Sequence, residues 1–569
     1  MKEYLYEGKN EEELILKMLN ELGVKEDEIL YVTKEETVGL LKKKKVTMKA
    51  ILKTDVLEYS KKFVTDLINA MGLDVKLETK RGENNILIKL YSDNNPILIG
   101  KNGRTLMSIQ NILHQSIYAK TGIHVNILLD VNSGGVHVID DITYDMLDYV
   151  EPPFDAECPK DVKAKLSDRY SAEEIEETYK EIVELYNEKL LFSDDVYGDF
   201  AETKVESPIK AMCLHIAHDC NLRCKYCFAS TGDFGTGRKL MPFSVGKQAI
   251  DFLLEKSVGR ENLELDFFGG EPLMNWDVVK QIVEYARSKE EEYGKKFRFT
   301  ITTNGMLLDD EKIDYINKEM SNVVLSIDGR KEVNDRMRVK VDGTGCYDRI
   351  VKNYKKLVEK RGDKEYYVRG TYTNYNLDFS EDVMHLYKQG FDQVSVEPVM
   401  EDESVEYAIT EKDLDKIYAE YDKLVDKIAN IKKNGGFINF FHFMIDLDQG
   451  PCVIKRLRGC GSGNEYVAIT PDGDIYPCHQ FVGHEEYKMG NLEEGTFNTD
   501  IKKEFAGCHV YSKPSCRDCW AKFYCSGGCN ANNYIYNGDI HKAYELSCKI
   551  MRKRLECAIL TKVCEQLDR

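Results

Sequence analysis

Apolar and polar positions in residues 205–440 follow two alternating patterns. Segments with helical periodicity, such as 275–293 and 346–361, separate short apolar runs that suit strands. Six strand–helix repeats predict parallel strands with right-handed crossovers, and therefore an α/β fold with an open, partial (β/α)6 barrel. We expect its functional site at the carboxyl ends of the strands. The strand-like runs lie near 209–216, 263–268, 297–303, 322–327, 365–373 and 392–398.

The first 131 residues predict two small α/β regions. In residues 1–50, a strand-like segment precedes a helical pattern that ends at Gly23. The four lysines at 42–45 suit a solvated loop between domains. Residues 51–131 then predict helix, strand, strand, helix, helix, strand. The helix predicted within residues 1–50 has an apolar side formed by Leu14, Ile15, Met18, Leu19 and Leu22.

Residues 123–204 predict a third small module. Two β-rich runs, 123–131 and 136–139, are joined by the turn residues Asn132 to Gly135, which indicates a hairpin. Acidic helical segments follow, and a hairpin with three helices suits a winged-helix module; a simple docking linker is the alternative. The run at 123–131 also suits the last strand of the preceding region. The sequence leaves open which of the two holds it, and whether they are naturally fused.

Composition excludes several classes of protein. The net charge of −19 argues against broad nucleic-acid or membrane-surface binding by the whole chain, although a local basic surface remains compatible with it. No apolar run is long enough to span a bilayer, and the N-terminus lacks a signal-peptide core, so we expect a cytoplasmic protein without membrane contact. The 17 cysteines then indicate metal binding rather than disulfides.

Three of these cysteines, Cys220, Cys224 and Cys227, follow the first predicted barrel strand. Three thiolates on one loop can hold three irons of a four-iron cluster and leave the fourth iron open to a ligand. Structural zinc, the alternative, usually takes four ligands in paired spacing. The spacing resembles the signature of radical S-adenosylmethionine (SAM) enzymes. The resemblance implies that SAM binds the open iron and that Tyr226 lies against its adenine.

Further residues at the predicted strand ends fit this resemblance. Gly269 and Gly270 allow close backbone approach after the second strand. Glu271 would then hold the SAM ammonium group. After the fourth strand, Ser326 and Asp328 would meet the ribose hydroxyls, and Arg338 would pair with the SAM carboxylate.

Residues 441–569 form a second cysteine-rich region. It contains a predicted hairpin that turns at Gly473, and its cysteine spacing resembles that of the SPASM domain. The resemblance implies two auxiliary 4Fe-4S clusters, three clusters in all. Cys452 is the candidate fourth ligand of the first; without it, an open iron could bind a substrate cysteine. Zinc is the alternative. The implied ligands are Cys460, Cys478 and Cys529 for the first auxiliary cluster, and Cys516, Cys519, Cys525 and Cys548 for the second.

A short glycine loop suggests a separate function near the N-terminus. Gly100, Lys101, Asn102 and Gly103 form a GxxG motif between two predicted helices. Such a loop clamps a nucleic-acid backbone in KH domains. Residues 1–131 resemble the Jag family of RNA-binding proteins, so RNA is a possible partner.

From about residue 127 onward the chain resembles the maturases of SCIFF peptides, which have six cysteines in forty-five residues. The segments 130–141 and 213–241 carry much of this likeness. The resemblance implies thioether bonds from cysteine sulfur to the α-carbon of another residue. It also implies a precursor peptide whose leader docks on the module at 123–204, and a reduced flavodoxin or ferredoxin-type electron donor. Formylglycine formation on a serine or cysteine, and RNA binding, are the competing functions.

Overall fold

The computed structural model describes residues 4–8, 10–24, 29–38, 43–52, 62, 76–81, 86–91, 126–130, 135–195, 197–198, 207–445 and 456–567. The chain forms two compact units. The first is built mainly from Met1–Asp194, and the second from Asp195–Asp446 and Pro451–Thr561.

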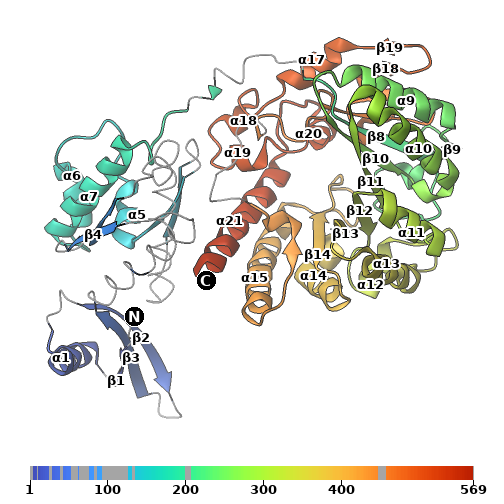
Figure 1. Ribbon diagram of the computed structural model, residues 1–569. Coiled ribbons are helices and arrows are strands. Elements are labelled where there is room, and N and C mark those ends of the chain that lie inside the picture. The colour runs from blue at the N-terminus through green and yellow to red at the C-terminus, as the bar shows by residue number, and fades with distance from the viewer. Residues whose placement is uncertain are drawn as a thin grey trace. The chain divides into compact units, whose positions relative to one another are not determined.

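The second unit is organised around one curved sheet (Figure 1). Its parallel part confirms all six predicted strands, with ends that agree to within two residues. A seventh parallel strand, β15 (Asn439–Phe440), extends the edge beyond the predicted set. The six strands are β8 (Ala211–His218), β10 (Asn262–Gly269), β11 (Lys296–Thr303), β12 (Asn322–Ser326), β13 (Tyr366–Tyr372) and β14 (Gln393–Pro398).

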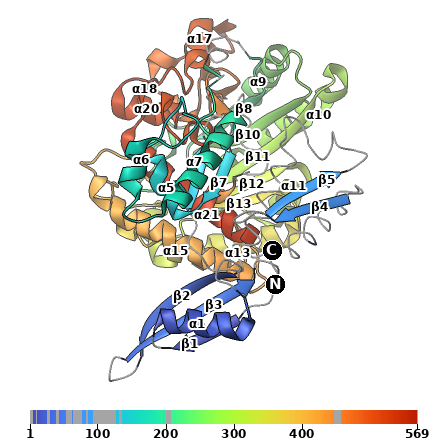
Figure 2. The same ribbon diagram turned by 90° about the vertical axis from the view of Figure 1, so that its left-hand side faces the viewer.

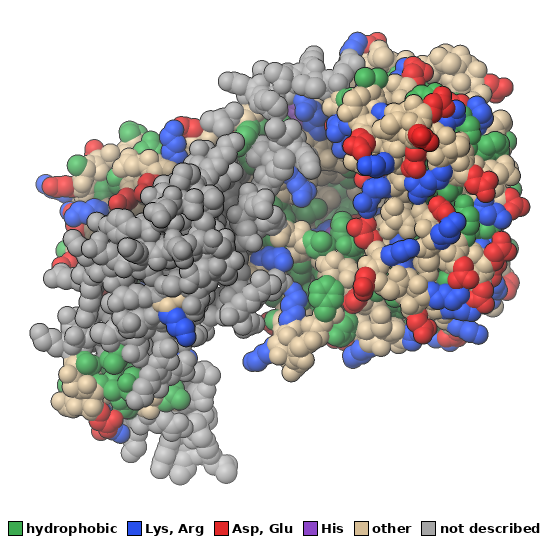
Figure 3. All heavy atoms as spheres, viewed as in Figure 1, with side chains coloured by type: hydrophobic (Ala, Val, Ile, Leu, Met, Phe, Trp, Pro, Cys, Tyr) green, Lys and Arg blue, Asp and Glu red, His purple; other side chains and the backbone are tan. Residues whose placement is uncertain are grey.

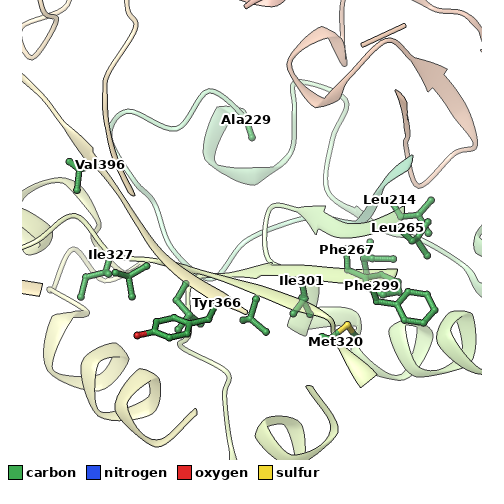
Figure 4. Close-up of a cluster of buried hydrophobic side chains, with 14 of the residues drawn as sticks. Leu214, Ala229, Leu265, Phe267, Phe299, Ile301, Met320, Ile327, Tyr366 and Val396 are labelled. Atoms are coloured by element: carbon green, nitrogen blue, oxygen red, sulfur yellow. The ribbon is translucent and has the colours of Figure 1, made fainter. Parts of the chain in front are cut away.

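Helices cover the convex side of this sheet (Figure 1). They bury every second strand residue, so that Leu265 and Phe267 of β10 meet Phe299 and Ile301 of β11 in one apolar layer (Figure 4). The other strand residues face the concave side. A partial α/β barrel is therefore confirmed. Its helices are α9 (Phe243–Lys256), α10 (Trp276–Tyr293), α11 (Asp310–Glu319), α12 (Lys331–Met337), α13 (Tyr347–Arg361), α14 (Phe379–Lys388) and α15 (Leu414–Lys433).

The cysteine-rich region continues the barrel sheet. Strand β16 (Tyr466–Ile469) pairs parallel with β8, and β17 (Asp474–Tyr476) returns antiparallel to it. Gly473 turns this predicted hairpin with a φ of +80°. The remaining elements are β18 (Gly490–Asn491), β19 (Thr496–Phe497), α17 (Thr499–Gly507), α18 (Pro514–Arg517), α19 (Lys522–Cys525), α20 (Asn530–Asn537) and α21 (Glu545–Leu567).

The first unit begins with a three-stranded antiparallel sheet. Strands β1 (Tyr4–Gly8), β2 (Ile29–Val38) and β3 (Lys43–Leu52) pair in the order β1-β3-β2, and α1 (Glu11–Leu22) packs on them through Leu14 and Met18. The loop predicted at the four lysines is wrong: three of them, Lys43 to Lys45, pair with Val38, Thr37 and Glu36. Further along the same strand, Val46 and Met48 occupy alternate positions and are buried.

The next strands form two separate hairpins. Strands β4 (Lys76–Arg81) and β5 (Ile86–Tyr91) pair with each other, and β6 (Asn126–Asp130) pairs with β7 (Gly135–Ile139). The predicted second hairpin is confirmed, and among the described strands β6 belongs to it rather than to the β4–β5 pair. The predicted helices around the GxxG motif lie outside the described residues.

Three helices follow the second hairpin (Figure 2). They are α5 (Asp141–Leu147), α6 (Lys160–Leu166) and α7 (Ala172–Asn187). Met146, Val162, Ile175 and Ile182 pack together between them. Ser171 caps α7 by a reciprocal pair of hydrogen bonds with Glu174. The predicted combination of a hairpin and three helices is thus present.

Two further observations concern the charges on the surface of the second unit and the apolar length of the helices. On the face of the second unit visible in Figure 3, Lys and Arg side chains are interspersed with Asp and Glu. Among the described helices, none combines the length and the apolar composition needed to cross a bilayer.

Candidate metal centres

Cys220, Cys224 and Cys227 lie on one partly buried loop at the carboxyl end of β8. The loop is fixed by backbone hydrogen bonds. Arg223 N donates to Val339 O at 2.7 Å, and Lys225 N donates to Met337 O at 2.9 Å. The three thiols therefore share one rigid segment at the barrel rim, where the sequence predicted them.

Two glycines allow this loop to sit directly on the next strand. Gly270 N donates to Ala217 O at 2.8 Å, and Glu271 N donates to Asp219 O at 2.9 Å. A Cβ on Gly270 would lie 2.2 Å from Asp219 O, and one on Gly269, whose φ is +118°, would lie 2.4 Å from Ala217 O. Only glycine permits this approach, so the pair seats the base of the cysteine loop.

Glu271 is fully buried beneath the loop. Its carboxylate accepts hydrogen bonds from Thr303 Oγ1 at 2.8 Å, Asn304 N at 2.8 Å and Leu273 N at 3.1 Å. Burial raises the pKa of Glu271 to about 7, although these hydrogen bonds oppose the shift. A buried carboxyl group of this kind favours a cationic partner.

Asn304 connects this carboxylate to the cysteine loop, a role that the sequence did not reveal. Its Nδ2 donates to Asn221 Oδ1 at 2.8 Å and lies 3.5 Å from Cys220 Sγ. Asn304 lies directly after β11, one residue before Gly305. This position could have identified it from the sequence, because loops that follow barrel strands meet at the same rim.

Tyr226, Asp328 and Arg338 form a second buried group at the same rim. The Tyr226 hydroxyl lies 2.7 and 2.6 Å from the Asp328 oxygens, and Arg338 Nη1 donates to that hydroxyl at 3.1 Å. Burial raises the pKa of Asp328 to about 6, opposed by the Arg338 charge. Ser326 lies half-buried at the end of β12. The structure brings these residues together, and their contacts with SAM stay predictions.

Four cysteines of the C-terminal region surround one cavity. Cys516 and Cys519 come from α18 and the residues after it, Cys525 ends α19, and Cys548 lies on α21. Burial, followed by the nearby Cys525 and Cys516, raises the pKa of the Cys548 thiol to about 12. The second predicted ligand set is therefore gathered around one space.

The other three predicted ligands form a separate group. Burial raises the pKa of the Cys478 thiol, and the neighbouring Cys529 and Cys460 add to the shift. Cys460 itself is exposed. Cys452, the candidate fourth ligand, lies outside the described residues. Five of the six cysteines without a predicted metal role, Cys158, Cys213, Cys346, Cys508 and Cys557, are buried.

The donor chemistry of these groups suits iron–sulfur clusters, whose irons take thiolate ligands. A zinc ion lies about 2.3 Å from each sulfur, which brings its ligands close to one another. Within the described part of the chain, no three His, Cys, Asp or Glu side chains converge in that way. Cysteines spaced around the cavity at α18, α19 and α21 suit a larger metal cluster.

The predicted nucleic-acid contacts cannot be placed in the same manner. Gly100, Lys101, Asn102 and Gly103 all lie outside the described residues. Their role stays a prediction from the sequence.

Comparison with known families identifies three domains. Residues 214–387 match the Radical SAM superfamily, residues 460–520 match SPASM, an iron–sulfur cluster-binding domain, and residues 58–128 match the KH domain of KhpA/KhpB.

Two individual proteins match the chain at low sequence identity. A cysteine-type anaerobic sulfatase-maturating enzyme of Clostridium novyi is 27% identical over 335 residues, which is 55% of this chain and 86% of that protein. The radical SAM cyclopropyl synthase TigE of Paramaledivibacter caminithermalis is 24% identical over 347 residues, 56% of this chain and 68% of that protein.

A solved structure, native anSMEcpe with bound AdoMet and Kp18Cys peptide, superposes with a TM-score of 0.53. It is 20% identical and covers 63% of this chain and 99% of that one, a likeness that shows the fold. The protein thus combines a radical SAM α/β fold with a SPASM domain and, near its N-terminus, a KH domain of the KhpA/KhpB type.

Proposed function

We propose that this protein is a radical SAM enzyme that forms thioether crosslinks in a ribosomally made, cysteine-rich peptide. The observation that carries the proposal is the arrangement of the cysteines. One triplet lies at the rim of a radical SAM barrel, and two further groups lie in the adjoining cysteine-rich region, of which residues 460–520 match SPASM. The sulfatase-maturating relative supports action on a polypeptide, and the SCIFF-like segments support the thioether product.

Each cysteine group has a distinct proposed role. Cys220, Cys224 and Cys227 would hold the cluster that binds SAM, which supplies a 5′-deoxyadenosyl radical when bound. The group around Cys478 and the group around Cys548 would hold the two auxiliary clusters.

The rim residues would orient SAM. Glu271 presents a buried carboxylate that can accept the SAM ammonium, and Arg338 presents a buried guanidinium for the SAM carboxylate. Asp328 would exchange its bond to Tyr226 for the ribose hydroxyls, while Ser326 lies beside it at the end of β12. This exchange releases the Tyr226 ring to lie against the adenine.

The overall reaction is balanced in atoms and electrons. One SAM is split into methionine and 5′-deoxyadenosine for each crosslink. The peptide loses one hydrogen from a cysteine thiol and one from an α-carbon, and a sulfur–carbon bond forms. The α-hydrogen is retained in deoxyadenosine and the thiol proton is released. A reduced flavodoxin or ferredoxin-type protein would supply the starting electron, and the one electron released when the sulfur–carbon bond forms would leave through an auxiliary cluster.

The hairpin β6–β7 would dock the leader of the peptide. Among the described strands, these two pair only with each other, and the helices α5 to α7 follow them. A leader segment can add to such a sheet as a further strand through main-chain hydrogen bonds. Removing the leader from the peptide should therefore weaken binding to the whole chain.

Mass spectrometry after anaerobic reaction tests the proposal. A thioether removes two hydrogens per crosslink and creates no aldehyde. Formylglycine, the competing product suggested by the sulfatase-maturating relative, creates an aldehyde that a hydrazide reagent captures. An aldehyde product would contradict the thioether assignment while leaving radical SAM chemistry intact.

RNA binding is a second candidate function, favoured by the KhpA/KhpB match at residues 58–128. Lys101→Asp together with Asn102→Asp adds negative charge to the GxxG loop and should weaken RNA binding by at least tenfold. Unchanged affinity of the full chain for single-stranded RNA would remove this function.

A further inference from the structure

Arg369 and Glu397 form an ion pair on the concave side of the barrel sheet. Arg369 Nη2 donates to Glu397 Oε2 at 2.8 Å. Their strand neighbours Val368, Val394 and Val396 are fully buried in the main apolar core. Because successive strand residues point to opposite faces, Arg369 and Glu397 face away from the helices. Their side chains are nevertheless 55% and 37% exposed, so both can be reached by a ligand.

A buried group of polar residues lies behind Glu397. Arg554 of α21 is the partner of His442 Nδ1 on one side of the imidazole ring, and Nε2 lies on the other side. That nitrogen lies 3.1 Å from Ser395 Oγ and 3.8 Å from Glu397 Oε1. Burial opposes ionisation of Glu397, but Arg369 and Arg554 outweigh it and lower its pKa. The two arginines therefore favour the ionised form of Glu397.

The pair lies close to the residues predicted to bind SAM. Arg369 is paired in register with Ser326 of β12 on one side and with Ser395 of β14 on the other. Two residues further along β13, Thr371 N donates to Asp328 Oδ1 at 3.1 Å. The pair thus borders the proposed SAM site on the concave side of the sheet.

Arg369 and Glu397 use only part of their hydrogen-bonding capacity. A guanidinium carries five N–H donors, and Arg369 makes one side-chain hydrogen bond with the described residues, to Glu397. A carboxylate can accept about four hydrogen bonds, so Glu397 also keeps free acceptor sites. A donor and an acceptor held side by side match the C=O and N–H groups of an extended peptide.

We propose that Arg369 and Glu397 bind the main chain of the substrate peptide next to the residue that is modified. Arg369 donates to a peptide carbonyl, and Glu397 accepts from a peptide N–H. This inference rests on the proposed function and adds how the substrate is held. Main-chain recognition suits an enzyme that modifies several different positions of one peptide, because it does not depend on their side chains. Both are positioning residues, since neither need exchange an atom with the substrate.

The test uses the full chain, reconstituted anaerobically, with a synthetic six-cysteine precursor peptide for turnover and its leaderless form for binding. Arg369→Gln and Glu397→Gln should each weaken binding of this peptide about tenfold or more, because each removes a charged hydrogen-bonding group. More deoxyadenosine should form per crosslink, while SAM affinity stays unchanged. N-methylation of the amides beside the acceptor residue should weaken binding to the wild type, and much less to Glu397→Gln.

A second ion pair provides the matched control. Arg298 Nη2 donates to Glu365 Oε2 at 3.0 Å, and these side chains are 52% and 63% exposed. They lie at the opposite, amino-terminal end of the barrel strands, so Arg298→Gln and Glu365→Gln should leave peptide binding unchanged.

Two outcomes separate this inference from the proposed function. If the wild type modifies the peptide and Arg369→Gln and Glu397→Gln behave like it within twofold, the inference is wrong and the proposed function stands. If the wild type modifies no peptide, both are wrong.

Discussion

The Tyr226 hydroxyl is shared between the two carboxylate oxygens of Asp328, at 2.7 and 2.6 Å. Tyr226 belongs to the cysteine loop, whereas Asp328 follows β12, so this contact ties the loop to the centre of the barrel. The same two residues are the ones predicted to meet the adenine and ribose of SAM. SAM bound at the predicted position would therefore compete with the contact.

Tyr226→Phe should lower the free energy of unfolding by about 1–3 kcal/mol, because Asp328 is buried and would lose a hydrogen-bond donor. Anaerobic urea unfolding of the reconstituted chain measures this change. Tyr293→Phe removes a hydroxyl from an exposed tyrosine and is the control. Equal stability of the two variants would contradict the structural role given to the contact.

Gly270→Ala should disturb the cysteine loop without a general loss of fold. The added Cβ would lie 2.2 Å from Asp219 O and 2.9 Å from Gly232 O, and neither backbone atom can rotate away. We expect about one third of the bound iron to be lost, since one of three proposed clusters depends on this loop. Deoxyadenosine formation should fall at least tenfold.

Iron content and deoxyadenosine yield are the two measurements for this variant. Gly507→Ala is its control, because a Cβ there would meet no atom within 4 Å. Full iron content and wild-type activity in Gly270→Ala would show that the loop tolerates the displacement.

Replacing cysteines of two groups tests two of the three proposed clusters. Alanine at Cys220, Cys224 and Cys227 should remove about four of twelve irons and abolish deoxyadenosine formation. Alanine at Cys516 and Cys548 should also remove about four irons, while deoxyadenosine formation continues. Cys508→Ala is the control, because Cys508 is buried beside Asn530 and outside the cavity lining. Iron loss in that variant equal to the loss in the others would contradict the assignment.

Local patterns were sufficient to predict the barrel and its rim. In β10 and β11, buried residues alternate with residues that face the concave side of the sheet. The sequence shows the same alternation of apolar and polar residues. The turn at Gly473 was also predictable, because Asp-Gly specifies a tight hairpin. Cysteine spacing grouped Cys516, Cys519, Cys525 and Cys548, which the structure gathers around one cavity.

Long-range pairing was not predictable from such patterns. The parallel pairing of β16 with β8 joins residues more than 250 positions apart, and nothing local in Tyr466 to Ile469 selects that partner. Arg369 and Glu397 each occupy a strand position on the concave side of the sheet. Their ion pair depends on the strand register, which brings the two side chains together. At Lys43 to Lys45, a run of like charges suggested a loop, but these residues pair with β2 in the same register that continues to Met48.

Arg330→Met should destabilise the barrel more than Lys331→Met, a substitution at the neighbouring exposed position. Arg330 N and Nε donate to Asp382 Oδ1 at 2.9 and 2.8 Å, and its two terminal nitrogens donate to Asp378 at 2.9 and 2.8 Å. Asp382 is fully buried, so the variant leaves a buried carboxylate without its cation. Breaking one side of such a pair costs about 3–5 kcal/mol, measurable by urea unfolding.

The pH dependence of this loss has a defined sign. Hydrogen bonds from Arg330 are the main reason that the pKa of Asp378 is lowered. A carboxylate with a lowered pKa contributes stability above its unfolded value of about 3.9, and this contribution disappears as the pH falls through the folded pKa. The difference between wild type and Arg330→Met should therefore be constant at neutral pH and shrink below about pH 4. Lys331→Met, which removes the neighbouring exposed ion pair with Asp348, should change stability little. A loss in Arg330→Met no larger than in Lys331→Met would show that Asp382 finds other partners.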